Sequence, residues 1–480
     1  MDGFTFGEKR TFTQSAVENC EIRNANCGFA GDAIRNSKTC NSKFEIRNSS
    51  FGESVVALVL IVCALTLVDN WPQWRGPRGQ GVSDEKNLPL DWSPTKNIKW
   101  KAAIPGRGHS SPIVWGNRVF LTTAIEGAVI PGASAVKHVV NNQVVKFPDT
   151  VGAERSHALK LISIDVETGK IVWERTVYEG RVHDDRQKTN SYASSTPATD
   201  GRYVYAYFGS EGLYCYDFDG NQVWKATLGG VAKMGYGEGT SPIIFENFVI
   251  LQVDTEMGDG SYIVAFDRMT GKQVWKTGRK NRSSWSTPVL VRGSKRVELI
   301  ASGAESVTSY DPATGKELWQ TEGLTSHAIP TPLVADDLVF LYAGSHDKRG
   351  YAVRLGESAG RILWRHDKGT AYVASGVLYD GSIYLITDSG TMTALDAKTG
   401  QLKYEGGRLP APSIFFASPV AFDGKILITS QDGDSFLITA GPKHELVATN
   451  SVGEPVFASP AISVGKIFIR GERNLFCIGK

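Results

Sequence analysis

A Ser or Thr followed by Pro recurs seven times along this chain of 480 residues, each time ahead of a short strand-forming run. An eighth copy, Ser375-Gly376, keeps the position and lacks the proline. From Pro197 onward, the steps between copies are 45, 46, 44, 44, 43 and 41 residues. A fixed period of this length indicates stacked supersecondary units, so this repeat constrains the fold more than any other feature. The seven pairs are Ser111-Pro112, Thr196-Pro197, Ser241-Pro242, Thr287-Pro288, Thr331-Pro332, Ser418-Pro419 and Ser459-Pro460.

One repeat contains four short strand-forming segments separated by three tight turns. In the copy that begins at Ser375, Asp380-Gly381 separates the first two segments, and Asp-Gly tolerates the positive φ that a hairpin turn requires. The proline opens the first strand, where no ladder hydrogen bond is lost. Turn density and the lack of a 3.6-residue periodicity exclude helical repeats. A four-stranded antiparallel sheet of about 40–45 residues has the period of a propeller blade.

The third turn and last strand of the repeat carry its sharpest motif. Residues 165–173 read Asp-x-x-Thr-Gly-Lys-x-x-Trp. Asp accepts backbone hydrogen bonds across such a turn, Gly supplies the positive φ, and Trp offers a large ring to bury between blades. Because the motif recurs in most repeats, we expect it to hold blades together rather than to bind a cofactor. Further copies lie at 267–275, 311–319 and 396–404, and shortened ones end at Trp224 and Trp364.

This motif resembles the tryptophan-docking repeat of pyrroloquinoline-quinone-type β-propellers, and the resemblance covers residues 98–480. The segment Trp71-Pro72-Gln73-Trp74-Arg75-Gly76-Pro77 is similar to the lead-in of secreted bacterial members of that superfamily. WD-repeat and kelch signatures do not fit. The resemblance implies either a quinoprotein dehydrogenase or a propeller without quinone, such as an outer-membrane assembly scaffold.

The repeats predict an all-β fold, an eight-bladed β-propeller of four-stranded antiparallel blades. The last blade, from Ala458, has room for only three strands, and residues 97–102, Asn-Ile-Lys-Trp-Lys-Ala, resemble the Lys-x-x-Trp strands that end other blades. We therefore expect this N-terminal strand to complete the last blade and close the ring. We also expect almost no helix, with Trp100 in the outer strand of the last blade. Trp residues expected to be largely buried between blades are Trp173, Trp224, Trp275, Trp319 and Trp364.

The first 70 residues are unlike the rest of the chain. Residues 1–53 form a polar leader, which we expect to be disordered or absent from the mature protein because the start was assigned too early. Residues 54–70 contain an apolar run that fits the core of a secretory signal and is short for a membrane span of about 20 residues. An uncleaved anchor is the alternative. Residues 71–97 read as an extended lead-in to the propeller at 98–480. These segments predict an exported, periplasmic or cell-envelope protein that meets the membrane only through its N-terminal apolar segment.

Charge and cysteine content restrict the partners. The chain has 52 basic and 50 acidic residues, which argues against an extended nucleic-acid surface. Beyond the first 70 residues only Cys215 and Cys477 remain, at the same strand position in blades two and eight. They are too far apart for a disulfide and read as small buried hydrophobes.

The loops that enter the innermost strands should surround the axial funnel on one face. They are rich in aromatic rings and polar tips, as a binding surface would be. The alternative is that these residues only pack the funnel mouth. Two insertions, residues 125–157 and 178–189, are placed to overhang this rim. We expect no catalytic residue and no metal ligand here, and the ligand-binding candidates are Arg107, His109, Tyr192, Tyr236, Glu238, Trp285, His327, Tyr372 and Phe416.

Three functions compete at this point. The favoured one is an exported, non-catalytic scaffold that binds an envelope protein or a glycan. The alternatives are a quinone (PQQ)-dependent dehydrogenase, and a hydrolase or lyase that uses the funnel. The dehydrogenases that the motif resembles commonly place adjacent cysteines beside the quinone, and this chain has no Cys-Cys pair. PQQ and calcium therefore lack motif support as cofactors, although the Asp-rich turns near Asp254 and Asp432 could attract calcium.

Overall fold

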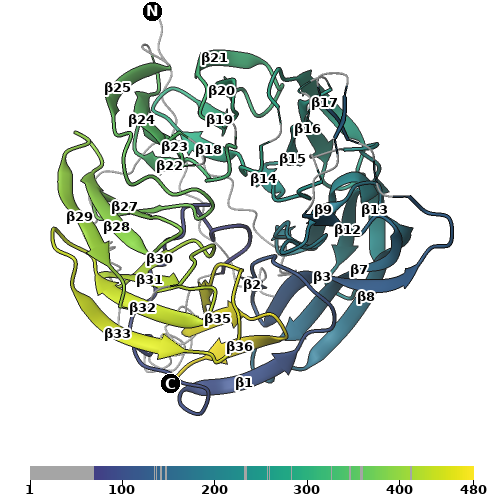
Figure 1. Ribbon diagram of the computed structural model, residues 1–480, viewed down its shortest axis with the longest axis horizontal. Coiled ribbons are helices and arrows are strands. Elements are labelled where there is room, and N and C mark those ends of the chain that lie inside the picture. The colour runs from purple at the N-terminus through teal and green to yellow at the C-terminus, as the bar shows by residue number, and fades with distance from the viewer. Residues whose placement is uncertain are drawn as a thin grey trace, which may run out of the picture. The chain divides into compact units, whose positions relative to one another are not determined.

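The computed structural model describes residues 70–480 except for 135, 137, 141–142, 146–148, 232–234, 257, 259, 283, 326, 345–346, 357–359 and 411–412. In this part of the chain, eight four-stranded antiparallel sheets follow one another around a central axis (Figure 1). The one helical element among the described residues is the 3-10 turn η1 (Gly209–Glu211). The all-β, eight-bladed propeller is thus confirmed. Within the described residues, no helix is both long and apolar enough to cross a bilayer. The predictions for residues 1–69 lie outside the described part.

Blades one to seven run in chain order from an inner strand near the axis to an outer strand, whereas blade eight takes its outer strand from the N-terminal side of the chain. Blades one to four comprise β2 (Ile113–Trp115), β3 (Arg118–Val129), β7 (Arg155–Asp165) and β8 (Ile171–Arg181); β10 (Ala198–Thr199), β11 (Tyr203–Tyr207), β12 (Leu213–Asp217) and β13 (Gln222–Ala226); β14 (Ile243–Phe245), β15 (Phe248–Val253), β16 (Tyr262–Asp267) and β17 (Gln273–Gly278); β18 (Val289–Arg292), β19 (Val297–Ala301), β20 (Ser306–Tyr310) and β21 (Glu317–Glu322).

Blades five to eight comprise β22 (Leu333–Ala335), β23 (Leu338–Ala343), β24 (Arg349–Arg354) and β25 (Arg361–Arg365); β26 (Val377–Tyr379), β27 (Ser382–Ile386), β28 (Thr391–Asp396) and β29 (Leu402–Arg408); β30 (Val420–Phe422), β31 (Lys425–Thr429), β32 (Asp434–Thr439) and β33 (Leu446–Ser451); β34 (Ala461–Ser463), β35 (Lys466–Arg470), β36 (Asn474–Ile478) and β1 (Ile98–Ala103). Two small additional sheets pair β4 (His138–Val140) with β5 (Gln143–Val145), and β6 (Thr150–Val151) with β9 (Arg186–Gln187).

The N-terminal strand closes the ring as the sequence predicts. β1 pairs with β36, and Trp100 lies opposite Cys477. Trp224 lies opposite Cys215 in the same register of blade two. Both cysteines are buried and free. The ring therefore ends without an open seam between its two terminal strands.

The tryptophan of each motif docks onto the glycine of the next blade. Trp224 donates from its indole to the carbonyl of Arg268 at 2.9 Å. Its ring covers Gly271, which has a φ of +69° and whose added Cβ would lie 2.6 Å from that ring. The Trp of one blade's motif therefore packs on the Gly of the next blade's motif, and this contact joins the two blades. The same contact joins Trp100 to Gly169, Trp173 to Gly220, Trp275 to Gly315, Trp319 to Gly360 and Trp364 to Gly400.

Burial of these tryptophans follows the prediction with one exception. Trp173, Trp224, Trp275 and Trp319 are buried, whereas Trp364 is half-buried. The expectation for Trp364 was wrong because its strand, β25, leaves every one of its residues exposed or half-exposed. The docking contact itself survives, and the Trp364 indole donates to the carbonyl of Lys398 at 3.1 Å.

The repeated Ser and Thr hydroxyls link the inner strands to one another. The Ser111 N–H donates to the Thr196 hydroxyl at 2.9 Å, and the Ser459 N–H donates back to the Ser111 hydroxyl at 3.0 Å. In seven of the eight repeats, the Ser or Thr hydroxyl thus accepts from a buried N–H of a neighbouring blade, and proline follows where no donor is needed. We call this set of links the hydroxyl ring. Its other links run from Thr196 to Ser241, Ser241 to Thr287, Thr331 to Ser375, Ser375 to Ser418, and Ser418 to Ser459.

The lead-in crosses the axis and closes one end of the channel. Trp74 donates from its indole to the hydroxyl of Thr331 at 2.9 Å. Arg75 is buried and donates to the carbonyls of Gly376, Gln80 and Pro419. Burial lowers the pKa of Arg75 to about 10. These contacts hold the lead-in, the purple segment near the centre of Figure 1, in place next to the hydroxyl ring.

Candidate functional site

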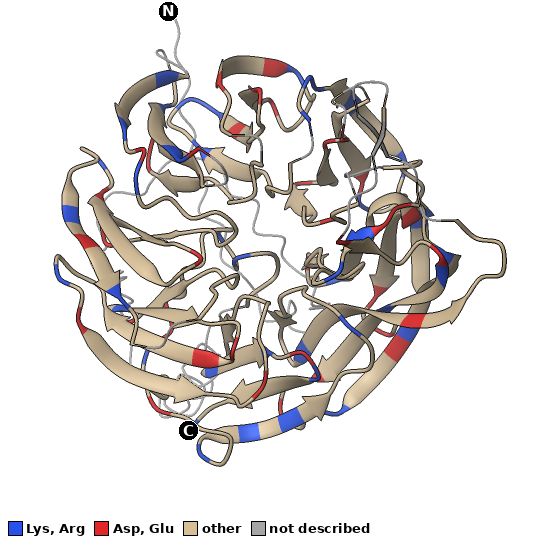
Figure 2. Ribbon diagram, in the orientation of Figure 1, with Lys and Arg blue, Asp and Glu red and all other residues tan. Residues whose placement is uncertain are grey.

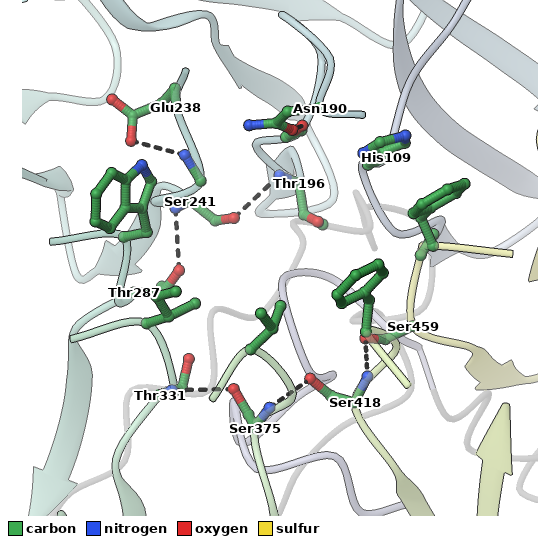
Figure 3. Close-up of a pocket in the computed structure, with 18 of the residues that line it drawn as sticks. His109, Asn190, Thr196, Glu238, Ser241, Thr287, Thr331, Ser375, Ser418 and Ser459 are labelled. Atoms are coloured by element: carbon green, nitrogen blue, oxygen red, sulfur yellow. Dashed lines mark hydrogen bonds between the residues drawn. The ribbon is translucent and has the colours of Figure 1, made fainter. Parts of the chain in front are cut away.

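The axis of the propeller holds a cavity of about 480 Å³, which we call the funnel. The hydroxyl ring surrounds it, as the dashed lines between Thr196, Ser241 and Thr287 and from Thr331 to Ser459 show in Figure 3. Trp74 of the lead-in lines it as well. Rim residues from the loops before each Ser/Thr mark complete its wall, so the funnel combines a polar waist with an aromatic mouth.

Two groups of aromatic rings face the funnel. On one side, His109 stacks on Phe457 with centroids 4.4 Å apart and planes at 10°, and Phe416 stacks on Phe457 at 6.0 Å. On the other, Trp285 packs against Tyr236 at 6.0 Å and against His327 at 5.6 Å. Such rings bury large contact areas at small conformational cost. The mouth therefore suits an apolar or aromatic guest.

The polar groups of the mouth are engaged by the protein itself. Glu238 accepts hydrogen bonds from the N–H groups of Gly239 and Thr240, at 2.9 and 3.0 Å, and from the Tyr207 hydroxyl at 3.0 Å. Trp285 donates to the carbonyl of Gly237 at 2.7 Å. These groups hold the rim loops in place, so none is set up as a nucleophile or a general base.

The Gly-x-Gly-x-Gly stretch of this loop has a packing role. Gly237 has a φ of +82°, and a Cβ there would meet the Asn190 amide at 3.0 Å. A Cβ on Gly239 would lie 3.2 Å from Trp285. The glycines therefore let Asn190 and Trp285 approach the loop.

His109 presents an uncharged ring to the funnel. Burial, together with the guanidinium groups of Arg107, Arg470 and Arg186, lowers its pKa to about 3. A hydrogen bond with Asn190 opposes this shift only in part. At neutral pH, His109 therefore acts as a flat polar ring and not as a cation.

The structure brings most of the predicted site residues together. His109, Tyr236, Glu238, Trp285, His327, Tyr372 and Phe416 line the funnel. Arg107 and Tyr192 do not line it and instead line a second cavity in blade one, because the insertions of that blade carry them outward. Ligand binding by the seven funnel residues remains a prediction.

Sequence reasoning missed two parts of the funnel. The hydroxyl ring was visible as the Ser/Thr marks, but only the partners across blades reveal its role. Trp74 lies in a segment that does not repeat, so no register placed it on the axis. Its position depends on the hydrogen bond to Thr331, which is 257 residues away in the sequence.

The described residues of the funnel do not fit a quinone–calcium centre. Calcium takes six to eight oxygen ligands, usually with carboxylates among them. The carboxylate among the funnel-lining residues, Glu238, already accepts three hydrogen bonds, and the described residues contain no cluster of three His, Cys, Asp or Glu side chains able to hold a metal. Asp254, a calcium candidate from the sequence, forms a fully buried ion pair with Arg279 at 2.8 Å.

Comparisons with known proteins agree with this architecture. Residues 130–241 and 259–414 match the family described as outer membrane protein assembly factor BamB. The match spans more than half of the chain, so the protein belongs to this family of PQQ-like propellers. No curated protein sequence matches the chain.

Solved structures show the same fold at low identity. A europium-containing methanol dehydrogenase has a TM-score of 0.60 and 12% identity, over 85% of this chain and 90% of its own. A quinohemoprotein alcohol dehydrogenase from Comamonas testosteroni has a TM-score of 0.58 and 11% identity, over 86% and 81%. BamB from Moraxella catarrhalis has a TM-score of 0.48 and 13% identity, over 72% and 98%. Such identities establish the fold alone.

Proposed function

We propose that this protein is an exported, non-catalytic binding scaffold of the cell envelope, whose funnel mouth holds side chains of a partner protein. The observation that carries this proposal is the engagement of Glu238 and Trp285 by their own backbone. A mouth with its polar groups engaged offers aromatic contact area and no activated group. The family description, an outer membrane protein assembly factor, supports an envelope protein as the partner.

The mouth has the features of a protein-binding hot spot. Aromatic residues near the centre of an interface carry most of its binding energy when they are fully desolvated. Trp285, Tyr236 and His327 form such a cluster, and the funnel of about 480 Å³ admits a few inserted side chains. A glycan would need free donors and acceptors to read its hydroxyl groups, which favours protein over glycan here.

Two tryptophans provide matched variants for the test. Trp285→Ala should weaken capture of the envelope partner roughly tenfold or more, with a small change in melting temperature. Trp364→Ala should lower the melting temperature and leave capture unchanged, because Trp364 belongs to the inter-blade contacts. Affinity capture from envelope extracts followed by titration with the identified partner gives both readouts. Loss of capture only in proportion to loss of folded protein would overturn the proposal.

A second titration addresses the dehydrogenase alternative. Purified protein is titrated with PQQ in the presence of calcium, and dye reduction with an alcohol is followed by absorbance. The scaffold proposal expects no saturable quinone absorbance and no dye reduction. Stoichiometric quinone uptake with calcium-dependent dye reduction would reverse the ranking of the two functions.

A further inference from the structure

Blade one contains a second cavity, of about 210 Å³, which we call the side cavity. Its strands β3, β7 and β8 have 12, 11 and 11 residues, whereas the outer three strands of the other blades have five to seven. The additional length extends past the repeat, and Arg107 pairs with Ala124 along it. The insertions supply Glu126, His157 and Arg186 to this cavity, and the rest of its lining is Gly106, Arg107, Ala124, Ser191 and Tyr192.

His157 is the central polar group of the side cavity. It is 2% exposed, and its ring packs edge-on against Tyr192 with centroids 4.7 Å apart. Among the described residues, neither ring nitrogen has a hydrogen-bond partner of normal geometry. A buried polar group without a partner is costly, so the structure favours a guest that accepts a hydrogen bond from this ring.

Arg107 contributes another donor of the same kind. Its two terminal nitrogens donate to the carbonyls of Lys188 and Thr189, at 2.9 and 2.8 Å, which fixes the guanidinium in place. Its buried Nε has no acceptor among the described residues. His157 and Arg107 thus bring donors without acceptors to one small space.

The charge of the side cavity is also positive. Arg107 and Arg186 line it against one carboxylate, Glu126. Glu126 is shared between Arg186, at 3.4 Å, and Arg155, at 3.3 Å, and its side chain is 44% exposed. The buried Arg186 side chain also lies over the ring of Tyr192, 5.6 Å from its centre. Among the described residues, Glu126 is the one carboxylate that lines the side cavity, whereas Glu154 and Glu472 act on His157 and Arg107 from outside the lining.

We propose that the side cavity of blade one binds a small oxyanion, of the phosphate or carboxylate class, independently of the funnel. The volume is several times the roughly 30 Å³ that one water occupies in the liquid, enough for such a group. The oxyanion accepts hydrogen bonds from His157 and from Arg107 Nε and balances the guanidinium charge. Glu126 competes for the same cations and sets the affinity.

The purified full chain tests this by calorimetric titration with inorganic phosphate and, separately, with acetate. Saturable binding of either ion is expected, and the ion that binds more tightly identifies the class. His157→Phe keeps the edge contact with Tyr192 and removes both nitrogens, so it should weaken binding at least tenfold. The matched control is His444→Phe: His444 also packs edge-on against a tyrosine, Tyr404, and has a buried nitrogen without a partner, but it is not among the residues that line the side cavity. This control should bind like the unaltered protein.

Glu126→Gln gives an independent readout if His157→Phe fails to fold. Removing the competing carboxylate should tighten oxyanion binding several-fold. Unchanged or weaker binding in Glu126→Gln would overturn the proposal. So would equal binding by His157→Phe and the unaltered protein, which would indicate an adventitious ion only, or the absence of saturable binding for both ions.

Discussion

The funnel and the side cavity use polar side chains in opposite ways. Around the funnel, the hydroxyl of Ser418 accepts from Ser375 N–H and the acid of Glu238 accepts from its own loop. In the side cavity, His157 and Arg107 Nε lack acceptors among the described residues. Around the funnel, the repeat pairs inner-strand hydroxyl groups with N–H groups one blade away. In blade one, by contrast, the long strands bring His157 and Arg107 together at a cavity where such partners are missing among the described residues.

Charge follows the same division. Lys, Arg, Asp and Glu are interspersed along the blades in Figure 2, and several described ion pairs, such as Arg78–Asp84 and Arg365–Glu322, join two exposed side chains. Such pairs contribute little to stability. Among the described residues, Arg279 and Asp254 form the one fully buried ion pair, and the Gln252 amide also donates to Asp254 at 2.7 Å. The buried charge of Asp254 therefore has partners within the protein, as the buried hydroxyl groups of the hydroxyl ring do.

The largest expected effect breaks the inter-blade contact. Gly271→Ala should lower the free energy of unfolding by about 2–4 kcal/mol, because its Cβ meets the Trp224 ring at 2.6 Å and its φ is positive. Gly424 also has a positive φ, +73°, but a Cβ added there would meet no atom within 4 Å. Gly424→Ala should therefore lower the free energy of unfolding by only about 1–2 kcal/mol. Urea unfolding measures both. Equal losses would show that backbone strain, and not the tryptophan, sets the effect.

Acid should weaken the funnel through His109. Its pKa is about 3 in the folded protein and 6.5 as the ordinary value, so the unfolded chain takes up the proton first as the pH falls. The stability that depends on an uncharged His109 is complete above pH 6.5 and is lost as the pH falls toward 3. We expect His109 to account for about 1–2 kcal/mol of loss by pH 5. His109→Phe should flatten this part of the profile, and an unchanged slope would assign the loss to other groups.

The hydroxyl ring should respond to single-atom changes. Ser418→Ala leaves the buried N–H of Ser375 without its acceptor, at 2.9 Å in the native protein. The expected loss is about 1–3 kcal/mol in urea unfolding. Ser413→Ala is a suitable control, because the Ser413 hydroxyl makes only a long, exposed contact of 3.5 Å to a neighbouring carbonyl. An unchanged free energy of unfolding for Ser418→Ala would mean that the hydroxyl ring does not contribute to stability.

The sequence could predict what the repeat period controls. Blade count, the closing strand at Trp100 and the convergence of rim residues such as Trp285 and His327 all follow from register. Hydrogen-bond partners a blade away, such as Ser375 for Thr331, could not be predicted, because they depend on the spacing between blades rather than on local sequence. Arg107 does not line the funnel because it pairs with Ala124 on the long strand β3 and lines the side cavity instead, and no repeat specifies this extension of blade one.

The smallest expected effect is the sharpest test of the comparison. His157→Phe removes two buried nitrogens that have no partner of normal geometry among the described residues, since the backbone of Arg155 acts on the ring only weakly. In buffer without phosphate or carboxylate, the variant should therefore change the free energy of unfolding by less than about 1 kcal/mol. Burial also lowers the pKa of His157, so the variant should be relatively more stable than the unaltered protein as the pH falls below 6.5. Adding the oxyanion should then stabilise the unaltered protein and not the variant. A loss as large as that of Ser418→Ala in oxyanion-free buffer would show that His157 is hydrogen-bonded within the fold. The polar groups of the side cavity would then be satisfied by the protein, as those of the funnel are, and the contrast between the two cavities would be wrong.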